Sequence, residues 1–333
     1  MQRSRLTRLA LVSALFLPQP MLAQSSMTGA VCGADTVELH TPTGVLHGSL
    51  KCPSTPAPWP VAVIIAGSGP TDRDGNTPLL PGKNNSLLMI ADGLAARGIA
   101  SIRYDKRAIG ASRGAAVSEA DLRFDMYADD AAGWVRALQG DKRFSTVTVV
   151  GHSEGSLLGM LAARLGGADA YASLEGAGRA AGVVIHEQLS KQLPPDMLAD
   201  ADKVIATLKS GQTTPDFPAP LASLFRPSVQ PYLASWFRYD PAEEIKRLTV
   251  PVLIVQGTTD VQVSMDDAHA LAAAKPTATM LTVDGMNHVL KMVPTLDQAA
   301  QMKAYTDPTL PVAPQVIDAI SSLIHGTRRR PAT

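Results

Sequence analysis

A serine flanked by glycines near the middle of the chain is the residue best placed to act as a nucleophile. It lies in the run GHSEG at residues 151–155, between a β-branched apolar segment at 146–150 and a helical pattern at 157–164. In a nucleophile elbow, a strand ends and a helix begins at the serine, and glycines two residues away on each side avoid backbone collisions. Ser153 is therefore predicted to present its hydroxyl for attack on a carbonyl carbon.

The serine needs a general base, and the base needs an acid that orients it. In a sheet of this kind, the acid and then the histidine follow the serine along the chain, at the carboxyl ends of strands. His288 is the one histidine after Ser153 that falls in a loop just past a predicted strand end. Asp260 is the only carboxylate in the loop after the preceding strand. We predict His288 as base and Asp260 as acid, with Glu175 as the alternative acid.

Two backbone N–H groups are expected to bind the negative charge that develops on the substrate oxygen. One belongs to Glu154, directly after the nucleophile, and the other to Ser68, in the turn GSGP at 67–70 that follows an apolar strand at 60–66. Losing one such donor typically costs about 3 kcal/mol of barrier. The Glu154 carboxylate is expected to interact with the helix dipole, and the alternative is that it binds the ammonium group of a peptide substrate.

Three further residues are candidates for substrate contact. Arg107 could clamp a carboxylate on the acyl group, although structural pairing with Asp105 or Asp72 is the favoured interpretation. Trp236 and Phe237 could pack a lid onto the core or line an acyl pocket, and the sequence leaves both roles open.

The elements that must position these residues alternate between strands and helices. Apolar strands are predicted at 60–66, 99–104, 146–150, 170–174, 250–255 and 279–283. Strands that are apolar on both faces are typical of a parallel sheet covered by helices on each side, so we expect an α/β fold. No strand pattern appears between about 180 and 239, where a helical insertion is predicted to cover the sheet.

Composition excludes several partner classes. The chain has 333 residues, 45% of them hydrophobic, and a formal net charge of zero. This is enough for one large domain or two small ones, and no basic stripe predicts nucleic-acid binding. We expect a small-molecule ester or a short peptide as substrate.

The first 23 residues are predicted to be a secretory signal peptide. Three arginines within the first eight residues precede an apolar run at 9–17, and Ala23 offers a small residue for cleavage. The apolar run is too short to span a bilayer, so no stable membrane anchor is expected. The mature protein is predicted to be secreted or periplasmic.

Both cysteines of the chain flank a predicted hairpin. Cys32 and Cys52 lie on either side of alternating segments at 36–40 and 45–50, joined by a turn. Folding at this turn brings the two cysteines together, and an oxidising compartment permits a disulfide. Two free buried thiols are the alternative.

Five motifs occur in order along the chain: AGSGP at 66–70, RYDKR at 103–107, GHSEG at 151–155, GTTD at 257–260 and MNH at 286–288. Together they resemble the motifs of the α/β-hydrolase superfamily over essentially the whole mature region, most closely the secreted bacterial branch related to serine aminopeptidases and esterases. The resemblance implies a mostly parallel eight-stranded sheet with helices on both faces, a lid between strands six and seven, and no cofactor; no metal site is expected.

This chain departs from the branch at two positions. Ala66 stands where many relatives have histidine, and Ala108 stands where glycine often follows the arginine. The expected division is a core at 24–178 and 240–333 with a helical lid at 179–239.

We therefore expect a carboxylesterase-like serine hydrolase that cleaves esters of small or medium acyl groups through an acyl-enzyme. The ester preference follows from the resemblance, because the same machinery serves esters, thioesters and amides. An aminopeptidase or acyl thioesterase with the same triad is the alternative. A non-catalytic binding protein is less favoured, since it has no physical need for all three triad residues.

Overall fold

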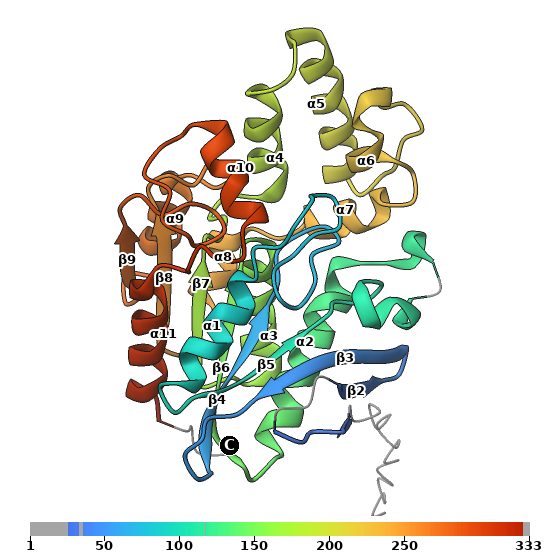
Figure 1. The fold of residues 1–333 in the computed structure, drawn as a ribbon. Helices are drawn as coiled ribbons and strands as arrows, with labels where there is room; N and C mark the ends of the chain where they lie inside the picture. Colours follow the sequence, from blue (N-terminus) through green and yellow to red (C-terminus); the bar gives the residue numbers. More distant parts are fainter. Residues whose placement is uncertain (1–25, 33–35, 117, 329–333) are drawn as a thin grey trace, which may run out of the picture.

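A computed structural model describes residues 26–32, 36–116 and 118–328. Within them, one nine-stranded sheet runs through the molecule in the order β1-β2-β3-β5-β4-β6-β7-β8-β9 (Figure 1). The strands are β1 (Ser26–Thr28), β2 (Val37–Thr41), β3 (Gly44–Lys51), β4 (Trp59–Ile65), β5 (Ala100–Tyr104), β6 (Phe144–His152), β7 (Ala170–Leu174), β8 (Val252–Gly257) and β9 (Thr279–Val283).

Six of the strands, β4 to β9, form the parallel part of the sheet. β1, β2 and β3 are joined to it through antiparallel pairs. The expected α/β fold is confirmed, but the expected number of eight strands is wrong for the described residues. The additional strand is β1, which pairs with β2 and has only three residues. A segment this short carries too little alternation to be predicted from its sequence.

Helices cover both faces of the sheet and enclose two apolar clusters. One face carries α1 (Ser86–Ala95) and α11 (Pro314–Gly326). The other carries α2 (Phe124–Gln139), α3 (Glu154–Gly166), α8 (Pro241–Lys246) and α9 (Met265–Ala274). All residues of the central strands β5 and β7 are buried, as continuous apolar strands in a covered parallel sheet should be.

A group of helices lies over the carboxyl ends of the strands, at the top of Figure 1. We call residues 181–236 the cap; its α-helices are α4 (Ala181–Ser190), α5 (Pro195–Lys209), α6 (Ala222–Phe225) and α7 (Gln230–Trp236). They share an apolar cluster of their own, separate from the two clusters of the core. The remaining helices are α10 (Gln298–Thr306) and the 3-10 helices η1 (Gly110–Ala115), η2 (Glu119–Asp121) and η3 (Ala219–Leu221).

The cap is attached to the core mainly through α2 and α7. The Phe124 and Trp236 rings are stacked with centroids 5.6 Å apart and planes 2° from parallel. The Ser235 hydroxyl accepts a hydrogen bond of 2.8 Å from the Phe124 N–H at the start of α2. Between α6 and α7, Arg226 forms an ion pair with Glu119 of η2. Aromatic stacking and polar contacts therefore fix this end of the cap.

A disulfide joins Cys32 to Cys52, with the Cα atoms 5.3 Å apart. The β2–β3 hairpin lies between the two cysteines and brings them together, as the turn chemistry predicts. The predicted signal peptide lies outside the described residues. No helix among those residues is long and apolar enough to cross a membrane.

Candidate active site

Ser153 occupies a sharp turn between the last residue of β6 and the first residue of α3. Its φ of 56° and ψ of −122° lie in a region that non-glycine residues rarely adopt. A Cβ on Gly151 would lie 2.1 Å from the Gly155 carbonyl oxygen, and a Cβ on Gly155 would lie 2.4 Å from the Ile65 carbonyl oxygen. Both contacts are far inside van der Waals distance, which explains why the flanking residues are glycines.

His288 and Asp260 form a hydrogen-bonded pair in the loops that follow β9 and β8. His288 Nδ1 lies 2.7 Å from Asp260 Oδ2, and the two side chains are 5% and 0% exposed. Burial alone would raise the pKa of Asp260, but the positive charge and hydrogen bond of His288 outweigh burial and lower it. Asp260 is therefore a carboxylate, and it accepts the hydrogen bond from His288 Nδ1.

The structure connects this pair to the nucleophile through His152. His152 Nε2 donates to the His288 carbonyl oxygen at 2.7 Å, and the two ring centroids are 5.0 Å apart. Burial and the neighbouring His288 lower the pKa of His152 to about 4, so its ring is neutral at neutral pH. Among the described residues, no hydrogen bond joins Ser153 Oγ to the His288 side chain. Such bonds are often long without substrate and shorten in the reacting complex.

The predicted oxyanion donors both lie at the nucleophile. Ser68 and Glu154 line the same cavity as Ser153. A Cβ on Gly67 would lie only 3.1 Å from the Ser153 Cβ, so the 67–70 turn is packed directly against the elbow. Glu154 is the first residue of α3, and its N–H has no acceptor in a preceding helical turn.

Beside these donors, Glu154 and Lys106 form a buried ion pair. Lys106 Nζ lies 3.0 Å from Glu154 Oε1, and the two side chains are 3% and 2% exposed. Lys106 Nζ also donates to the Gly67 carbonyl oxygen at 2.5 Å. No local sequence pattern marks Lys106 as part of the site, because its partners are 39 and 48 residues away along the chain.

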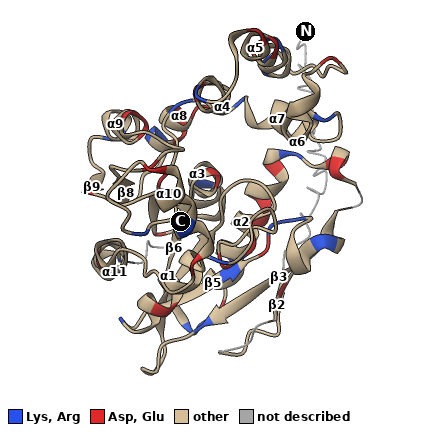
Figure 2. Cartoon of the chain, turned by 45° about the horizontal axis from the view of Figure 1, so that its top comes forward, with Lys and Arg blue, Asp and Glu red and all other residues tan. Residues whose placement is uncertain are grey.

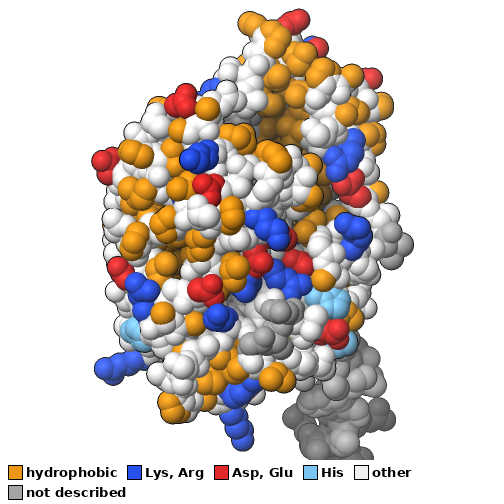
Figure 3. All heavy atoms as spheres, viewed as in Figure 1, with side chains coloured by type: hydrophobic (Ala, Val, Ile, Leu, Met, Phe, Trp, Pro, Cys, Tyr) orange, Lys and Arg blue, Asp and Glu red, His pale blue; other side chains and the backbone are white. Residues whose placement is uncertain are grey.

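A cavity of about 850 Å³ lies between the cap and the carboxyl ends of the strands. Figure 3 shows a hollow lined with hydrophobic side chains between these two parts of the molecule. The cap contributes Tyr232, Leu233 and Trp236 to its wall, and the core contributes Ser153 and Leu157. Apolar walls with a few polar groups at one point are typical of a small-molecule site.

Two predicted substrate contacts do not line the cavity. Phe237 follows the last turn of α7 and is rotated by about 100° from Trp236, so it packs inside the apolar cluster of the cap. Arg107 is 1% exposed, and its guanidinium donates to Asp130 of α2 and to the Ala115 carbonyl oxygen. Arg107 lies in the turn that follows β5, and its side chain reaches Asp130 of α2, whereas Lys106 lines the cavity.

The expected charge partners of Arg107 are also corrected. Arg107 pairs with Asp130, whereas Asp105 accepts from Arg73 at 2.8 Å. The Asp130 contact is 23 residues away in the chain and depends on how α2 packs against the sheet. Nothing in the local sequence indicates that pairing.

Glu175, the alternative acid, lies behind Asp260. It is fully buried, and its carboxyl oxygens accept hydrogen bonds from the Gly257 N–H at 2.8 Å and the Gln256 side chain at 2.5 Å. Burial and the negative charge of Asp260 raise the pKa of Glu175 well above its usual value. This environment favours the neutral form of Glu175, and a hydrogen bond with Glu175 helps to lower the pKa of Asp260. Asp260 remains the charged partner of the histidine.

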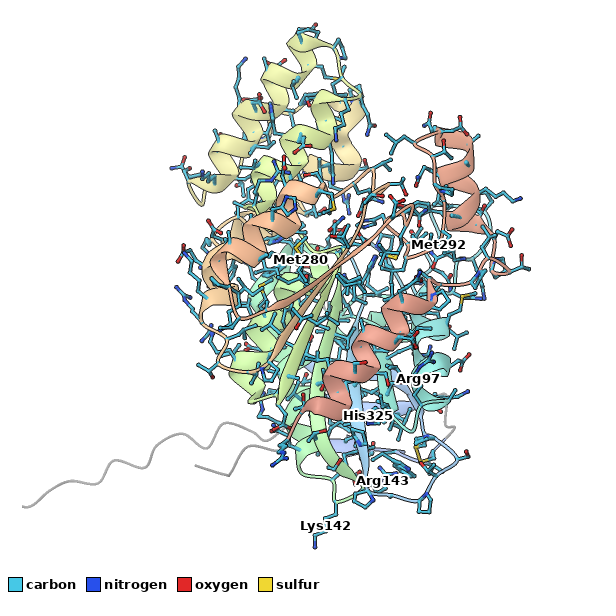
Figure 4. All side chains as sticks on the ribbon, turned by 90° about the vertical axis from the view of Figure 1, so that its left-hand side faces the viewer. Arg97, Lys142, Arg143, Met280, Met292 and His325 are labelled. Atoms are coloured by element: carbon cyan, nitrogen blue, oxygen red, sulfur yellow. A yellow bond between two sulfur atoms is a disulfide. The ribbon has the colours of Figure 1, made fainter. Side chains whose placement is uncertain are left out.

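The other histidines described here lie elsewhere. Figure 4 shows His325 near the C-terminal end of α11 beside Arg97, and its Nε2 lies 3.0 Å from the Arg97 carbonyl oxygen. His186 pairs with Asp202 on the exposed side of the cap.

Acidic and basic residues occur together on core and cap helices (Figure 2). Across the described ranges, no cluster of three or more His, Cys, Asp or Glu could hold a metal ion.

Comparison with known proteins identifies the family. The sequence model of the Alpha/beta hydrolase family matches residues 45–304, so the chain belongs to that family. It is 26% identical over 286 residues to Esterase EstD of Thermotoga maritima; the match covers 84% of this chain and 66% of that esterase.

Solved structures share the fold at low sequence identity. Est1E from Butyrivibrio proteoclasticus is 16% identical with a TM-score of 0.56, over 88% of this chain and 100% of that one. Alpha/beta hydrolase domain-containing protein 10 from mouse is 16% identical with a TM-score of 0.55, over 88% and 99% of the two chains. These likenesses support the fold that the strand order defines.

Proposed function

We propose that this chain is a carboxylesterase-like serine hydrolase with Ser153 as nucleophile, His288 as base and Asp260 as acid. The 2.7 Å hydrogen bond between His288 and Asp260, at the sheet edge where the strained Ser153 turn lies, carries the proposal. Ser153, Asp260 and His288 follow the ends of β6, β8 and β9, which supports a catalytic triad of the kind used for acyl transfer to serine.

The chemistry follows from the positions of the groups. His288 Nε2 removes the Ser153 hydroxyl proton while Oγ attacks the ester carbonyl carbon. The oxyanion so formed accepts hydrogen bonds from the Ser68 and Glu154 N–H groups. The carbon–oxygen bond to the alcohol then breaks, and the alcohol leaves with the proton from His288. Water, deprotonated by the same histidine, attacks the acyl-enzyme and releases the acid.

The cavity supports esters of small or medium acyl groups over peptides. Its wall is largely apolar, and the Glu154 carboxylate, which could have bound a substrate ammonium, is already paired with Lys106. An aminopeptidase would need that carboxylate free to face its substrate. Acyl thioesters remain the alternative substrates, since thioester and ester cleavage use the same groups.

We also propose that residues 179–239 act as a lid unit on a core formed by 24–178 and 240–333. The separate apolar cluster of the cap supports this division. Export of the protein stays a proposal, with which the Cys32–Cys52 disulfide is compatible.

The test is a substrate panel with Ser153→Ala as the reference. p-Nitrophenyl esters, acyl thioesters and aminoacyl anilides are compared, and a fluorophosphonate probe is used to label the serine. We expect ester hydrolysis that falls by at least about 10³-fold in the variant, with probe labelling of the native protein only. Folded native protein that neither reacts with the probe nor cleaves any ester would overturn the proposal and favour a binding protein.

A further inference from the structure

Lys106 touches both halves of the proposed oxyanion hole. It follows β5 directly, and its side chain, which lines the cavity, is only 3% exposed. One hydrogen bond goes to the Gly67 carbonyl oxygen and one to the Glu154 carboxylate. On its other side, the ammonium lies 5.7 Å from the Tyr127 ring centroid. Three different elements therefore hold this cation in one position.

The hydrogen bond from Lys106 to the Gly67 carbonyl affects the Ser68 N–H, because the two groups belong to one peptide. In that peptide, the Lys106 ammonium hydrogen-bonded to the carbonyl oxygen draws electron density away from the Ser68 nitrogen. Hydrogen bonds in a low-dielectric site polarise one another, and a polarised amide is a stronger donor. The contact also fixes the plane of that peptide and hence the direction of the Ser68 N–H.

The bond to Glu154 ties the second donor to the first. Glu154 supplies the other N–H, and its side chain is held by the same ammonium. The carboxylate also balances the charge of a lysine that would otherwise be costly to bury.

We propose that Lys106 is a positioning residue for the oxyanion hole, which it orients and strengthens through the Gly67–Ser68 peptide. The inference rests on the proposed function. It assigns no proton transfer to Lys106, because its ammonium is held by an acceptor on each side. Its effect belongs to the transition state, where charge appears on the substrate oxygen, and not to substrate binding.

The test compares Lys106→Met, Lys106→Arg and Glu154→Gln with a control, Lys275→Met. Lys275 also donates to a backbone carbonyl, that of Leu248 at 2.7 Å, but it lies outside the site. kcat and KM are measured on a p-nitrophenyl ester, together with the inhibition constant of a trifluoromethyl ketone, which forms an oxyanion with the serine. Cooperative thermal unfolding confirms that each variant is folded.

In Lys106→Met we expect kcat to fall by about 10- to 100-fold with KM changed less than about threefold. The inhibition constant of the trifluoromethyl ketone should rise by the same factor by which kcat/KM falls. Loss of packing alone would not produce this match. Lys106→Arg should recover part of the rate, because it restores a cation near the carbonyl. Glu154→Gln keeps the Gly67 contact and should lose less than Lys106→Met, and Lys275→Met should match the native enzyme.

A kcat for Lys106→Met within about threefold of native, or a rate loss without any loss of ketone affinity, would overturn the inference. If that variant does not fold, Lys106→Gln takes its place, since its amide reaches less far and carries no charge. Failure of the proposed function is seen separately, as a native protein without esterase activity or probe labelling.

Discussion

At the scale of single residues, the buried Glu175–Asp260 carboxyl pair makes the stability of the fold depend on pH. The pKa of Glu175 is raised above its usual 4.5 by burial and by Asp260, so the folded protein holds a proton that the unfolded chain releases. The stabilisation from this proton is complete below about pH 4.5 and is lost as the pH rises through the folded pKa. Asp260, with a lowered pKa, has the opposite dependence: its contribution is present above its unfolded pKa and lost in acid.

Replacing Glu175 by Gln should therefore flatten the alkaline side of the stability profile. The melting temperature of the native protein should fall as the pH rises from about 5 through the raised pKa, while Glu175→Gln should show a weaker decline. Glu187→Gln is the control, because Arg179 lowers the pKa of Glu187 and its contribution is lost only in acid. Scanning calorimetry between pH 4 and 10 measures all three proteins. Parallel curves for native protein and Glu175→Gln would contradict the assignment of a neutral Glu175.

Sequence spacing marks the three residues of the proposed triad but not the residues that surround them. Ser153, Asp260 and His288 each follow a strong local signal, namely a glycine pattern or a loop just after a strand. Lys106 and His152 contact partners that only the fold brings close, so no local pattern marks them. The ion-pair partner of Arg107 was wrongly predicted for the same reason. Asp130 lies on α2, and the local sequence does not indicate how that helix packs.

At the scale of elements, the turn between β6 and α3 depends on a close approach of backbones. Gly155→Ala would place a methyl group 2.4 Å from the Ile65 carbonyl oxygen of β4, so the helix must move away from the sheet. We expect a loss of about 3 kcal/mol in the free energy of unfolding, together with loss of activity. Denaturant unfolding and the ester assay measure the two effects.

Gly114→Ala is the matched control for this change. No heavy atom lies within 4 Å of a Cβ built at Gly114, so the free energy of unfolding should change by less than about 0.5 kcal/mol. Equal stability of the two variants would contradict the steric explanation of the elbow glycine.

Most core elements could be predicted because their apolar patterns are long. The segments at 170–174 and 279–283 coincide with β7 and β9. α10 and α8 were missed. α8 has only six residues, and α10 follows a loop and has no clear apolar face. Such elements are stabilised mainly by tertiary contacts.

At the scale of the whole molecule, the proposed esterase function predicts that the space between cap and core determines which acyl chains fit. Each CH₂ group buried in an apolar cavity contributes about 0.8 kcal/mol, so kcat/KM should rise about fourfold per added carbon until the chain reaches the far wall. Trp236 forms part of that wall. Trp236→Ala should shift the best p-nitrophenyl ester toward longer chains. A profile with an unchanged optimum would place the acyl group elsewhere.

Trp59→Ala is the control for loss of an indole. Trp59 packs against Phe144 at the beginning of β4, and it does not line the cavity. This variant should lose stability without any change in the preferred chain length, so a shift in both variants would point to a general loosening of the fold.

The cap leaves the core after β7 and returns before β8, and these two strands are neighbours in the sheet. Its helices fill their own interior. Replacing the cap by that of another α/β-hydrolase should thus require few changes in the core. Such chimeras would keep the reaction of the core and acquire a different substrate selectivity.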